Sequence, residues 1–511
     1  MIAVLDFGSQ YTHLITRRIR SLGVSAEIFE TDINPKILQE KNVSGIILSG
    51  GPGSVNDKNA PKFDKEILDL GIPILGICYG HQLLGQVLGG EVKPGKVREY
   101  GEKTLYVAAG STNLFSGLSA KEQVWFSHGD GVTKLPKGFI STASTKDVKN
   151  AAMANNQRKI YGIQFHIEVA HTKKGMKILE NFIFGICKSS KDWQVEDLRA
   201  KIVKDLRDKV GNKKVIIGVS GGVDSLVASR LLDEAIGKNL YCVFIDTGFM
   251  RKNEPEEVKN LYLSLGFKNF INASAGEDFL KALKGISEPE EKRKAFSREY
   301  FLVFEKVAKE LKQKEHVEYL AQGTIYPDRI EAAKTSKTAH VIKSHHNTTL
   351  PEKIGFKLLE PLADFYKDEV RALGKTLGIS NESLNRHPFP GPGLLIRILG
   401  EVSEEKLDLL READAIFLEE LKKSGWYSKI WQAFAALLPV RSVGVMGDER
   451  TYEYILVLRA VTSIDAMTAD WARIPEDILN KTSKRITNEI RGVNRVLYDI
   501  SQKPPSTIEY E

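Results

Sequence analysis

One cysteine stands where its side chain could act on a ligand. The stretch PILGICYGHQLLGQVLGG, residues 73–90, runs from an apolar segment that predicts a strand into a helical pattern, and Cys78 lies at the junction. Gly76 and Gly80, two residues to either side, would permit the crowded strand-to-helix turn of a nucleophile elbow. The N-terminus of the following helix would favour the thiolate. The alternative is an inert core cysteine, since cysteines are frequently buried.

A thiol nucleophile also requires a base and a group that orients the base. The string QFHIEV offers both, because His166 and Glu168 would project from one face of an extended chain. Glu168 could then hold the imidazole in the reactive tautomer, as the carboxylate does in serine triads. Taken alone, this pattern is more typical of a solvated strand face.

A glycine turn could complete such a site. In SGGPGS, residues 49–54, backbone N–H groups can point at one place, and with the N–H of Tyr79 they could form an oxyanion hole. An ordinary proline–glycine turn after a strand is the alternative.

In combination these parts resemble the class I glutamine amidotransferases, and the likeness covers essentially all of residues 1–187. The resemblance implies that the Cys78 thiolate attacks the carboxamide of glutamine. It makes His166 the base and then the acid for the leaving ammonia, and it makes Glu168 the group that orients His166.

The same resemblance matches Gly51 and Tyr79 to the oxyanion-hole positions. One position departs from the family pattern, which usually reads His-Pro-Glu. Ile167 replaces the proline here, so the fixed φ that proline imposes is missing. The catalytic side chains on either side are retained, so the implied roles are unchanged.

A second glycine turn follows an apolar run in VIIGVSGGVDSLVASRLL. Gly221 and Gly222 would leave backbone N–H groups accessible to a ligand, and Ser220 and Ser225 would add hydroxyls. The N-terminus of the following helix favours an anion. No Gly-Lys-Ser or Gly-Lys-Thr follows, so this is not a Walker A loop. Asp224 would suit a divalent cation that accompanies phosphates. A plain strand-to-helix turn is the alternative.

The string SGGVDS resembles the signature of the ATP pyrophosphatase superfamily, whose members cleave ATP to AMP and pyrophosphate while adenylating an acceptor oxygen. The resemblance implies that ATP binds together with Mg²⁺, for which Asp224 is the candidate ligand. The implied ATP-binding residues are Ser220, Gly221, Gly222, Val223, Asp224, Ser225 and Leu226.

An amidotransferase followed by an ATP pyrophosphatase resembles the glutamine-hydrolysing GMP synthases. Strings such as AQGTIYPDRIE, RHPFPGPGL and KPPSTIEYE extend the likeness over nearly the full length. The resemblance implies that glutamine supplies ammonia, that ATP adenylates XMP, and that ammonia displaces AMP to give GMP. The matched positions are Arg293, Gln432, Lys503 and Glu509 for XMP, and Lys343, His345 and His346 for a lid over the nucleotide.

The elements that must position these residues form three successive regions. Strand and helix patterns alternate in residues 1–190 and again in 191–386, which predicts two doubly wound α/β domains with parallel sheets. The segment RHPFPGPG cannot form a regular element and marks the second boundary. Residues 387–511 predict a smaller α+β domain, which by resemblance is a dimerisation domain and implies a homodimer.

The composition agrees with an enzyme of several domains. The chain has 511 residues, 42% hydrophobic and 27% charged, enough for about three cores. Three cysteines cannot build a disulfide framework, no run of 18 apolar residues occurs and no export signal is visible, so we expect a cytoplasmic protein without a membrane partner. A net charge of +7 without dense basic blocks does not favour nucleic acid.

Two other functions stay open at this point. One is another glutamine-dependent adenylating synthetase, although the N-terminal region does not resemble the nitrilase-type glutaminase of NAD⁺ synthetases. The other is a non-catalytic nucleotide-binding regulator, which would not need the cysteine nucleophile.

Overall fold

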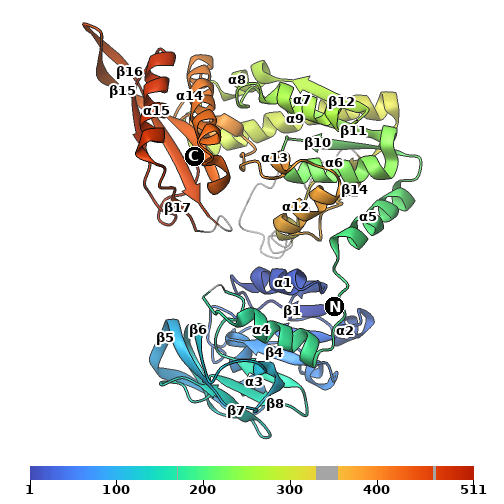
Figure 1. The fold of residues 1–511 in the computed structure, drawn as a ribbon. Helices are drawn as coiled ribbons and strands as arrows, with labels where there is room; N and C mark the ends of the chain where they lie inside the picture. Colours follow the sequence, from blue (N-terminus) through green and yellow to red (C-terminus); the bar gives the residue numbers. More distant parts are fainter. Residues whose placement is uncertain (170, 330–354, 464–467) are drawn as a thin grey trace. The chain divides into compact units, whose positions relative to one another are not determined.

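The computed structural model describes residues 1–169, 171–329, 355–463 and 468–511. Its chain forms two compact units, Met1–Asp197 and Leu198–Glu511 (Figure 1). The division into three domains at residues 190 and 386 stays a prediction.

The first unit is built on a nine-stranded sheet with the order β2-β1-β3-β4-β9-β8-β7-β5-β6. Strands β1, β3, β4 and β9 are buried along their whole length, as expected for parallel strands covered on both faces. The parallel half of the sheet consists of β1 (Ile2–Leu5), β2 (Ala26–Phe29), β3 (Gly45–Leu48), β4 (Ile74–Ile77) and β9 (Ile160–Ile163).

The other half of this sheet is antiparallel, which differs from the purely parallel sheet that the sequence predicts. Buried and accessible side chains are mixed along β6, because one face of an antiparallel sheet can meet water. Such strands lack the continuous apolar runs that predict a parallel sheet. They are β5 (Glu91–Val107), β6 (Lys121–Lys134), β7 (Ile140–Ser144) and β8 (Ala152–Asn155).

Helices cover both faces of the parallel half, which confirms the doubly wound α/β class for this unit. Ile15 of α1 and Ile178 of α4 belong to one apolar cluster, whereas Leu38 of α2 and Leu83 of α3 belong to another. The helices are α1 (Thr12–Ser21), α2 (Pro35–Glu40), α3 (Tyr79–Val87) and α4 (Gly175–Glu180), with short helical turns at Lys65–Asp69, Asn113–Phe115 and Asn181–Ile186.

The second unit contains a five-stranded parallel sheet with the order β12-β11-β10-β13-β14. Its strands are β10 (Lys214–Val219), β11 (Leu240–Asp246), β12 (Asn269–Ser274), β13 (Val317–Ala321) and β14 (Lys357–Leu359). The alternating pattern of residues 191–386 predicts a parallel sheet in this region, whereas β14 by itself is too short to give a pattern. The helices of this region are α5 (Val195–Val210), α6 (Val223–Ile236), α7 (Glu254–Ser264), α8 (Gly276–Leu283), α9 (Pro289–Glu315), α12 (Lys367–Thr376) and α13 (Asn381–Leu384).

The C-terminal part of the same unit carries a second, mixed sheet. Strands β15 (Gln432–Met446) and β16 (Glu449–Thr462) form a long antiparallel hairpin, while β17 (Asp470–Trp471) and β18 (Val493–Tyr498) pair with β16. The helices here are α14 (Glu404–Lys423) and α15 (Glu476–Glu489), with helical turns at Gly393–Arg397 and Tyr427–Lys429. One apolar cluster contains Ile216, Phe417 and Leu456, so a continuous core joins the two sheets.

Candidate active sites

Cys78 lies between the end of β4 and the first residue of α3, with φ 52° and ψ −101°. A positive φ is uncommon for a residue that has a Cβ. The Cys78 N–H donates to the Ile163 carbonyl oxygen at 2.8 Å, which ties the turn to β9. This strained strand-to-helix turn has the geometry of the predicted nucleophile elbow.

Close packing explains the two glycines beside the cysteine. A Cβ on Gly76 would lie 2.5 Å from the carbonyl carbon of Gly80. A Cβ on Gly80 would lie 2.4 Å from the carbonyl oxygen of Leu48. Both distances are far inside van der Waals contact, so a larger side chain would push α3 away from β3 and β4.

His166 and Glu168 meet directly. His166 Nδ1 lies 2.7 Å from Glu168 Oε1, and the two side chains are 4% and 1% exposed. Strand β9 ends at Ile163, so His166 lies just beyond the strand that the sequence predicts for it. The His166 N–H instead donates to the Trp125 carbonyl oxygen at 2.9 Å, which keeps the backbone extended for the contact two residues on.

The environment of His166 favours its protonated form. Burial by itself lowers the pKa of His166, but the Glu168 carboxylate and hydrogen bonding with Cys78 and Glu168 outweigh it, so the pKa is raised well above 6.5. An imidazole that holds a second proton beside a thiol stabilises the thiolate. The arrangement can therefore generate the nucleophile that cysteine chemistry requires.

Cys78 and His166 both line a cavity of about 800 Å³, a volume that suits a small-molecule ligand. Gly51 and Tyr79, predicted for the oxyanion hole, line the same cavity. The Tyr79 phenol donates to the Pro61 carbonyl oxygen at 2.8 Å, so that side chain is bound elsewhere and the backbone of Tyr79 adjoins the thiol.

Three side chains of this region were missed by the sequence prediction. The Tyr11 ring stands edge-on to the His166 imidazole, with centroids 5.1 Å apart and an interplanar angle of 68°. Gln164 Nε2 donates to Cys78 Sγ at 3.7 Å, and Asp130 lines the cavity. Gln164 stands in the string QFHIEV, which could have pointed to it, whereas Tyr11 and Asp130 carry no local signal.

The string SGGVDS forms the predicted turn between β10 and α6. Gly221 has φ 72°, and Ser225 Oγ donates to the Gly222 carbonyl oxygen at 3.1 Å. Val223 and Leu226 are 5% and 1% exposed. These two residues can therefore offer a ligand little besides their backbone atoms.

Asp224 is the acidic residue of this turn. Its Oδ2 pairs with Lys367 Nζ at 2.5 Å, and its Oδ1 is buried with no hydrogen-bond partner among the described residues. A buried carboxylate oxygen without a donor fits a cation ligand, so the residue present is compatible with Mg²⁺. Within the described ranges, no group of three or more His, Cys, Asp or Glu side chains is placed to hold a metal ion by itself.

Three of the four positions predicted for XMP lie at contacts of the C-terminal tail. Gln432 Nε2 donates to Glu509 Oε1 at 2.5 Å, and Arg293 Nη2 donates to the carbonyl oxygen of Glu511. Sequence reasoning missed Arg397, whose Nε and Nη2 donate to the two carboxylate oxygens of Glu509 at 3.0 and 2.8 Å. The tail is therefore held against the body of the second unit.

Lys503 anchors the tail at an earlier point in the sequence, because its backbone pairs with that of Ala469 through hydrogen bonds of 2.8 and 3.0 Å. The predicted lid residues Lys343, His345 and His346 lie outside the described residues.

Comparisons with known proteins agree along the whole chain. Family models match residues 3–186 (glutamine amidotransferase class-I), 195–299 (NAD synthase) and 419–510 (GMP synthase C terminal domain). The curated GMP synthase (glutamine-hydrolyzing) of Carboxydothermus hydrogenoformans is 51% identical over 511 residues, and that of Aquifex aeolicus is 52% identical; each match covers 100% of this chain and 99% of the relative. The chain belongs to the glutamine-hydrolysing GMP synthase family.

The solved structure of a glutamine amidotransferase from Thermotoga maritima is 25% identical in sequence. The match covers 38% of this chain and 88% of the chain in that structure, with a TM-score of 0.28. The family assignment rests on the full-length relatives. It confirms the predicted α/β class and the predicted enzyme class, an ATP-dependent ligase with a glutamine amidotransferase domain. It also confirms the predicted function, glutamine-dependent synthesis of GMP, against the two alternatives of another adenylating synthetase and a non-catalytic regulator. In the part of the chain that the structure describes, no helix has the length and apolar character needed to cross a membrane.

Proposed function

We propose that the first unit hydrolyses glutamine through a thioester on Cys78. His166 takes the thiol proton, the thiolate attacks the side-chain carboxamide carbon, and the imidazolium gives the proton to the departing ammonia. Water activated by His166 then cleaves the thioester and releases glutamate. The observation that carries this proposal is the buried His166–Glu168 pair at 2.7 Å, with His166 and Cys78 lining one cavity of about 800 Å³.

Negative charge develops on the carboxamide oxygen when the thiolate attacks. The proposed donors to this oxygen are backbone N–H groups at Gly51 and Tyr79, and the N-terminus of α3 adds a favourable dipole. A Cβ on Gly51 would lie 2.9 Å from the Phe7 carbonyl oxygen, so the backbone there is packed too closely for any other residue. Its position against the cavity supports the role.

The second unit is proposed to bind ATP on the SGGVDS turn. The backbone of Gly221 and Gly222 and the hydroxyls of Ser220 and Ser225 would contact the phosphates at the N-terminus of α6. Magnesium, when bound with the nucleotide, neutralises charge on the phosphates, and Asp224 would hold it.

The acceptor is proposed to be XMP, bound by Arg293, Gln432, Lys503 and Glu509. The C2 oxygen of XMP attacks the α-phosphate of ATP and pyrophosphate leaves; ammonia then adds at C2 and AMP leaves, giving GMP. Arg293 and Lys503 supply positive charge for the XMP phosphate. Glu509, fixed by Arg397, offers carboxylate oxygens to purine or sugar donors.

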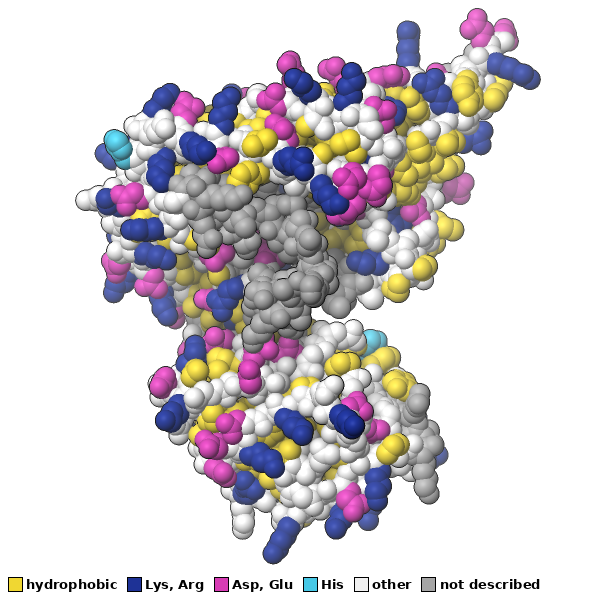
Figure 2. Space-filling model, turned by 180° about the vertical axis from the view of Figure 1, so that it is seen from behind, with side chains coloured by type: hydrophobic (Ala, Val, Ile, Leu, Met, Phe, Trp, Pro, Cys, Tyr) yellow, Lys and Arg dark blue, Asp and Glu magenta, His cyan; other side chains and the backbone are white. Residues whose placement is uncertain are grey.

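The active form is proposed to be a homodimer in the cytoplasm. Val443, Val445 and Tyr452 on the β15–β16 hairpin are 59%, 73% and 64% exposed. The hairpin extends beyond the rest of its sheet, and hydrophobic side chains gather around it (Figures 1 and 2). An apolar surface of this kind suits burial against a second copy. The three cysteines are unpaired and buried, in keeping with a reducing compartment.

One assay tests the proposed roles of the two units. The wild type and Cys78→Ala are given XMP, ATP and Mg²⁺ with either glutamine or ammonium, and GMP is measured. The wild type is expected to use both nitrogen sources, and the variant only ammonium. Absence of GMP from the wild type under every condition would overturn the proposal, and glutamine-dependent GMP from Cys78→Ala would overturn the role of the thiol.

A further inference from the structure

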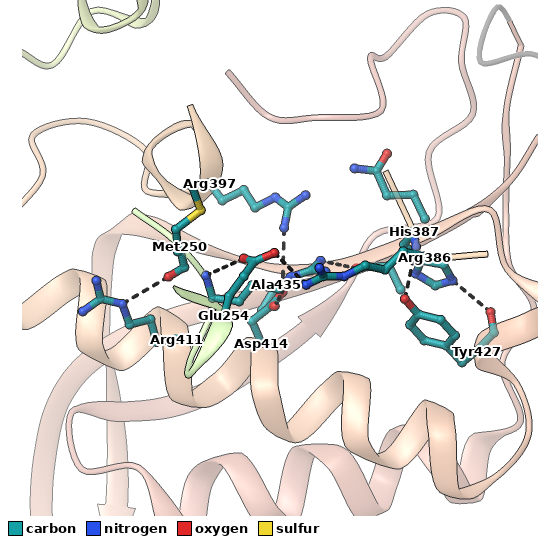
Figure 3. A network of polar contacts seen from close by, with 12 residues as sticks. Met250, Glu254, Arg386, His387, Arg397, Arg411, Asp414, Tyr427 and Ala435 are labelled. Carbon is teal, nitrogen blue, oxygen red and sulfur yellow. Dashed lines mark hydrogen bonds and ion pairs between the residues drawn. The ribbon is translucent and has the colours of Figure 1, made fainter. Parts of the chain in front are cut away.

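A chain of buried and partly buried charged residues of alternating sign runs from the SGGVDS turn to the C-terminal tail. Figure 3 shows its central part, where side chains from α7, α14 and the segment before the Gly393–Arg397 turn converge. Its members in order are Arg386, Glu254, Arg251, Asp414, Arg397 and Glu509. Among the first five, only Arg397 has a role in the proposals above, where it fixes Glu509.

The end of the chain at the nucleotide turn is formed by Arg386. Its Nη1 donates to the carbonyl oxygen of Gly221 at 3.4 Å, and its Nη2 donates to Glu254 Oε1 at 2.7 Å. Glu254 is 3% exposed at the start of α7. The other oxygen of Glu254 accepts the backbone N–H of Arg251 at 3.0 Å, so the glutamate holds the next member of the chain.

The centre of the chain is Asp414 on α14, which is 1% exposed. Its Oδ2 lies 2.9 Å from Arg251 Nε, and its Oδ1 accepts the backbone N–H of Ala435 on β15 at 3.0 Å. Arg397 Nη1 lies 3.9 Å from the same Oδ1. One carboxylate therefore faces two guanidinium groups and also a strand of the C-terminal sheet.

The end of the chain at the tail is formed by Arg397, which is fully buried. Its guanidinium lies 4.2 Å from the ring centroid of Phe434 and 5.1 Å from that of Phe389, and it binds Glu509 with two hydrogen bonds. Arg251 lies 4.8 Å from the Phe389 ring as well. The two guanidinium groups thus share an aromatic ring in addition to Asp414.

The burial of Glu254, Asp414 and Arg397 makes the members of this chain depend on one another. Removing one partner of a buried ion pair leaves an uncompensated charge, which costs more than the pair itself contributes. The weakest connection is the 3.9 Å separation between Arg397 and Asp414, and Arg397 Nη1 has no hydrogen-bond partner among the described residues. A small displacement on either side therefore tightens or loosens this one connection.

We propose that Asp414 is a positioning residue that couples the nucleotide turn to the acceptor-binding tail. When ATP orders the turn at Gly221, Arg386 and Glu254 fix Arg251, Asp414 fixes Arg397, and Arg397 presents Glu509 to the acceptor. Acceptor binding strengthens nucleotide binding by the same factor, because coupling is reciprocal. This inference rests on the proposed assignment of ATP to the turn and of XMP to the tail.

The test measures the affinity for XMP by titration calorimetry, with and without a non-hydrolysable ATP analogue and Mg²⁺. In the wild type the analogue is expected to tighten XMP binding at least about fivefold. Asp414→Asn keeps an acceptor for the Ala435 N–H, and Glu254→Gln keeps one for the Arg251 N–H, but each removes a charge from the chain. Both variants are expected to bring the ratio of the two affinities close to one.

A matched control lies on the same helix. Glu412 pairs with Lys252 at 2.7 Å, both side chains being close to half exposed, so this pair joins the same two segments at the surface. Glu412→Gln is expected to keep the wild-type ratio. A general loss of stability would weaken both affinities and leave the ratio unchanged, which separates positioning from a structural role.

The remaining outcomes are distinguishable. A wild-type ratio of one, or an unchanged ratio in both Asp414→Asn and Glu254→Gln, would overturn the coupling. Glu509→Gln serves as the check on the tail itself. If this variant binds XMP as tightly as the wild type, the assignment of the tail fails; if it weakens XMP binding while the ratio survives in the chain variants, only the coupling fails.

Discussion

Glu168 Oε1 lies 2.7 Å from His166 Nδ1 in a part of the first unit where both side chains are almost fully buried. The second oxygen of Glu168 has no hydrogen-bond partner among the described residues. The imidazole is therefore the main compensation for this buried carboxylate, and the carboxylate is the main favourable influence on the imidazolium. Glu168 and His166 therefore act as a pair, and their combined charge determines how well the imidazolium stabilises the Cys78 thiolate.

Replacing Glu168 by glutamine should separate orientation from charge. The Glu168→Gln side chain keeps the shape of glutamate, but the loss of the carboxylate lowers the pKa of His166 and weakens the thiolate–imidazolium state. Glutamine-dependent GMP formation is expected to fall by up to about 10⁴-fold, the loss that the equivalent change causes in a serine triad. Ammonium-dependent GMP formation should stay at the wild-type rate, and a parallel loss of both activities would contradict this role.

The elbow should tolerate no side chain at Gly80. In Gly80→Ala the new Cβ would lie 2.4 Å from the Leu48 carbonyl oxygen, so α3 must shift, at a typical cost of about 1–3 kcal/mol. Glutamine-dependent activity is expected to fall at least about tenfold, since a 1 Å displacement of a reacting group can cost more. Gly185→Ala is the control, because a Cβ there meets no atom within 4 Å. Equal activity of the two variants would contradict the argument.

The sequence predicts the triad because its two parts are local patterns. Cys78 stands between two glycines at a strand–helix junction, and His166 and Glu168 are two residues apart. The contact between Arg251 and Asp414 has no such signal. Asp414 is one acidic residue in the amphipathic pattern of α14, and its partner lies on a distant loop, so only the packing of the two sheets around one core brings them together.

The strands of the first unit also differ in whether a local sequence pattern predicts them. Buried parallel strands such as Gly45–Leu48 are continuous apolar runs and are visible in the sequence. The pairing of Glu91–Val107 with Lys121–Lys134 depends on cross-strand contacts between polar, partly exposed residues. Strand propensity in such segments depends on neighbours that a local pattern does not contain.

Asp224 should affect the ATP reaction and leave glutamine hydrolysis intact. Asp224→Asn removes the charge that pairs with Lys367 and the carboxylate proposed for Mg²⁺. Pyrophosphate release in the presence of XMP is expected to fall at least about 10²-fold, because charge on the departing phosphates is less well compensated. Part of the loss should be recovered at high Mg²⁺. Unchanged pyrophosphate release at limiting Mg²⁺ would exclude Asp224 from this site.

His387 should make the protein sensitive to acid. Its Nε2 contacts the Tyr427 carbonyl oxygen at 2.9 Å and its ring stacks on Tyr427 at 3.7 Å. Burial lowers the pKa of His387 from 6.5 to about 4. Between pH 6.5 and about 4, His387 is therefore protonated in the unfolded chain but neutral in the folded chain. The contribution of His387 to stability is fully present above pH 6.5 and is lost as the pH falls toward 4.

The size of this loss is about 3 kcal/mol over the whole window. His387→Gln keeps a donor for the Tyr427 carbonyl oxygen but does not titrate. Its melting temperature is expected to fall less than that of the wild type between pH 7 and about 4.5. Identical pH dependence of the two melting temperatures would show that His387 is protonated in the folded state at its ordinary pKa.

The exposed apolar side chains of the β15–β16 hairpin should hold the proposed dimer together. Val443 and Tyr452 are register partners on the two strands and are 59% and 64% exposed. The double variant Val443→Lys with Tyr452→Glu removes apolar surface but places opposite charges across the strands, which preserves the hairpin. Sedimentation should give twice 57.0 kDa for the wild type and 57.0 kDa for the variant. Leu302→Lys, at a position 49% exposed on α9, should leave the dimer intact. The charges should separate the subunits, because a charge buried at an apolar interface is strongly unfavourable. A monomeric wild type, or a double variant that remains dimeric, would rule out this surface as the dimer interface.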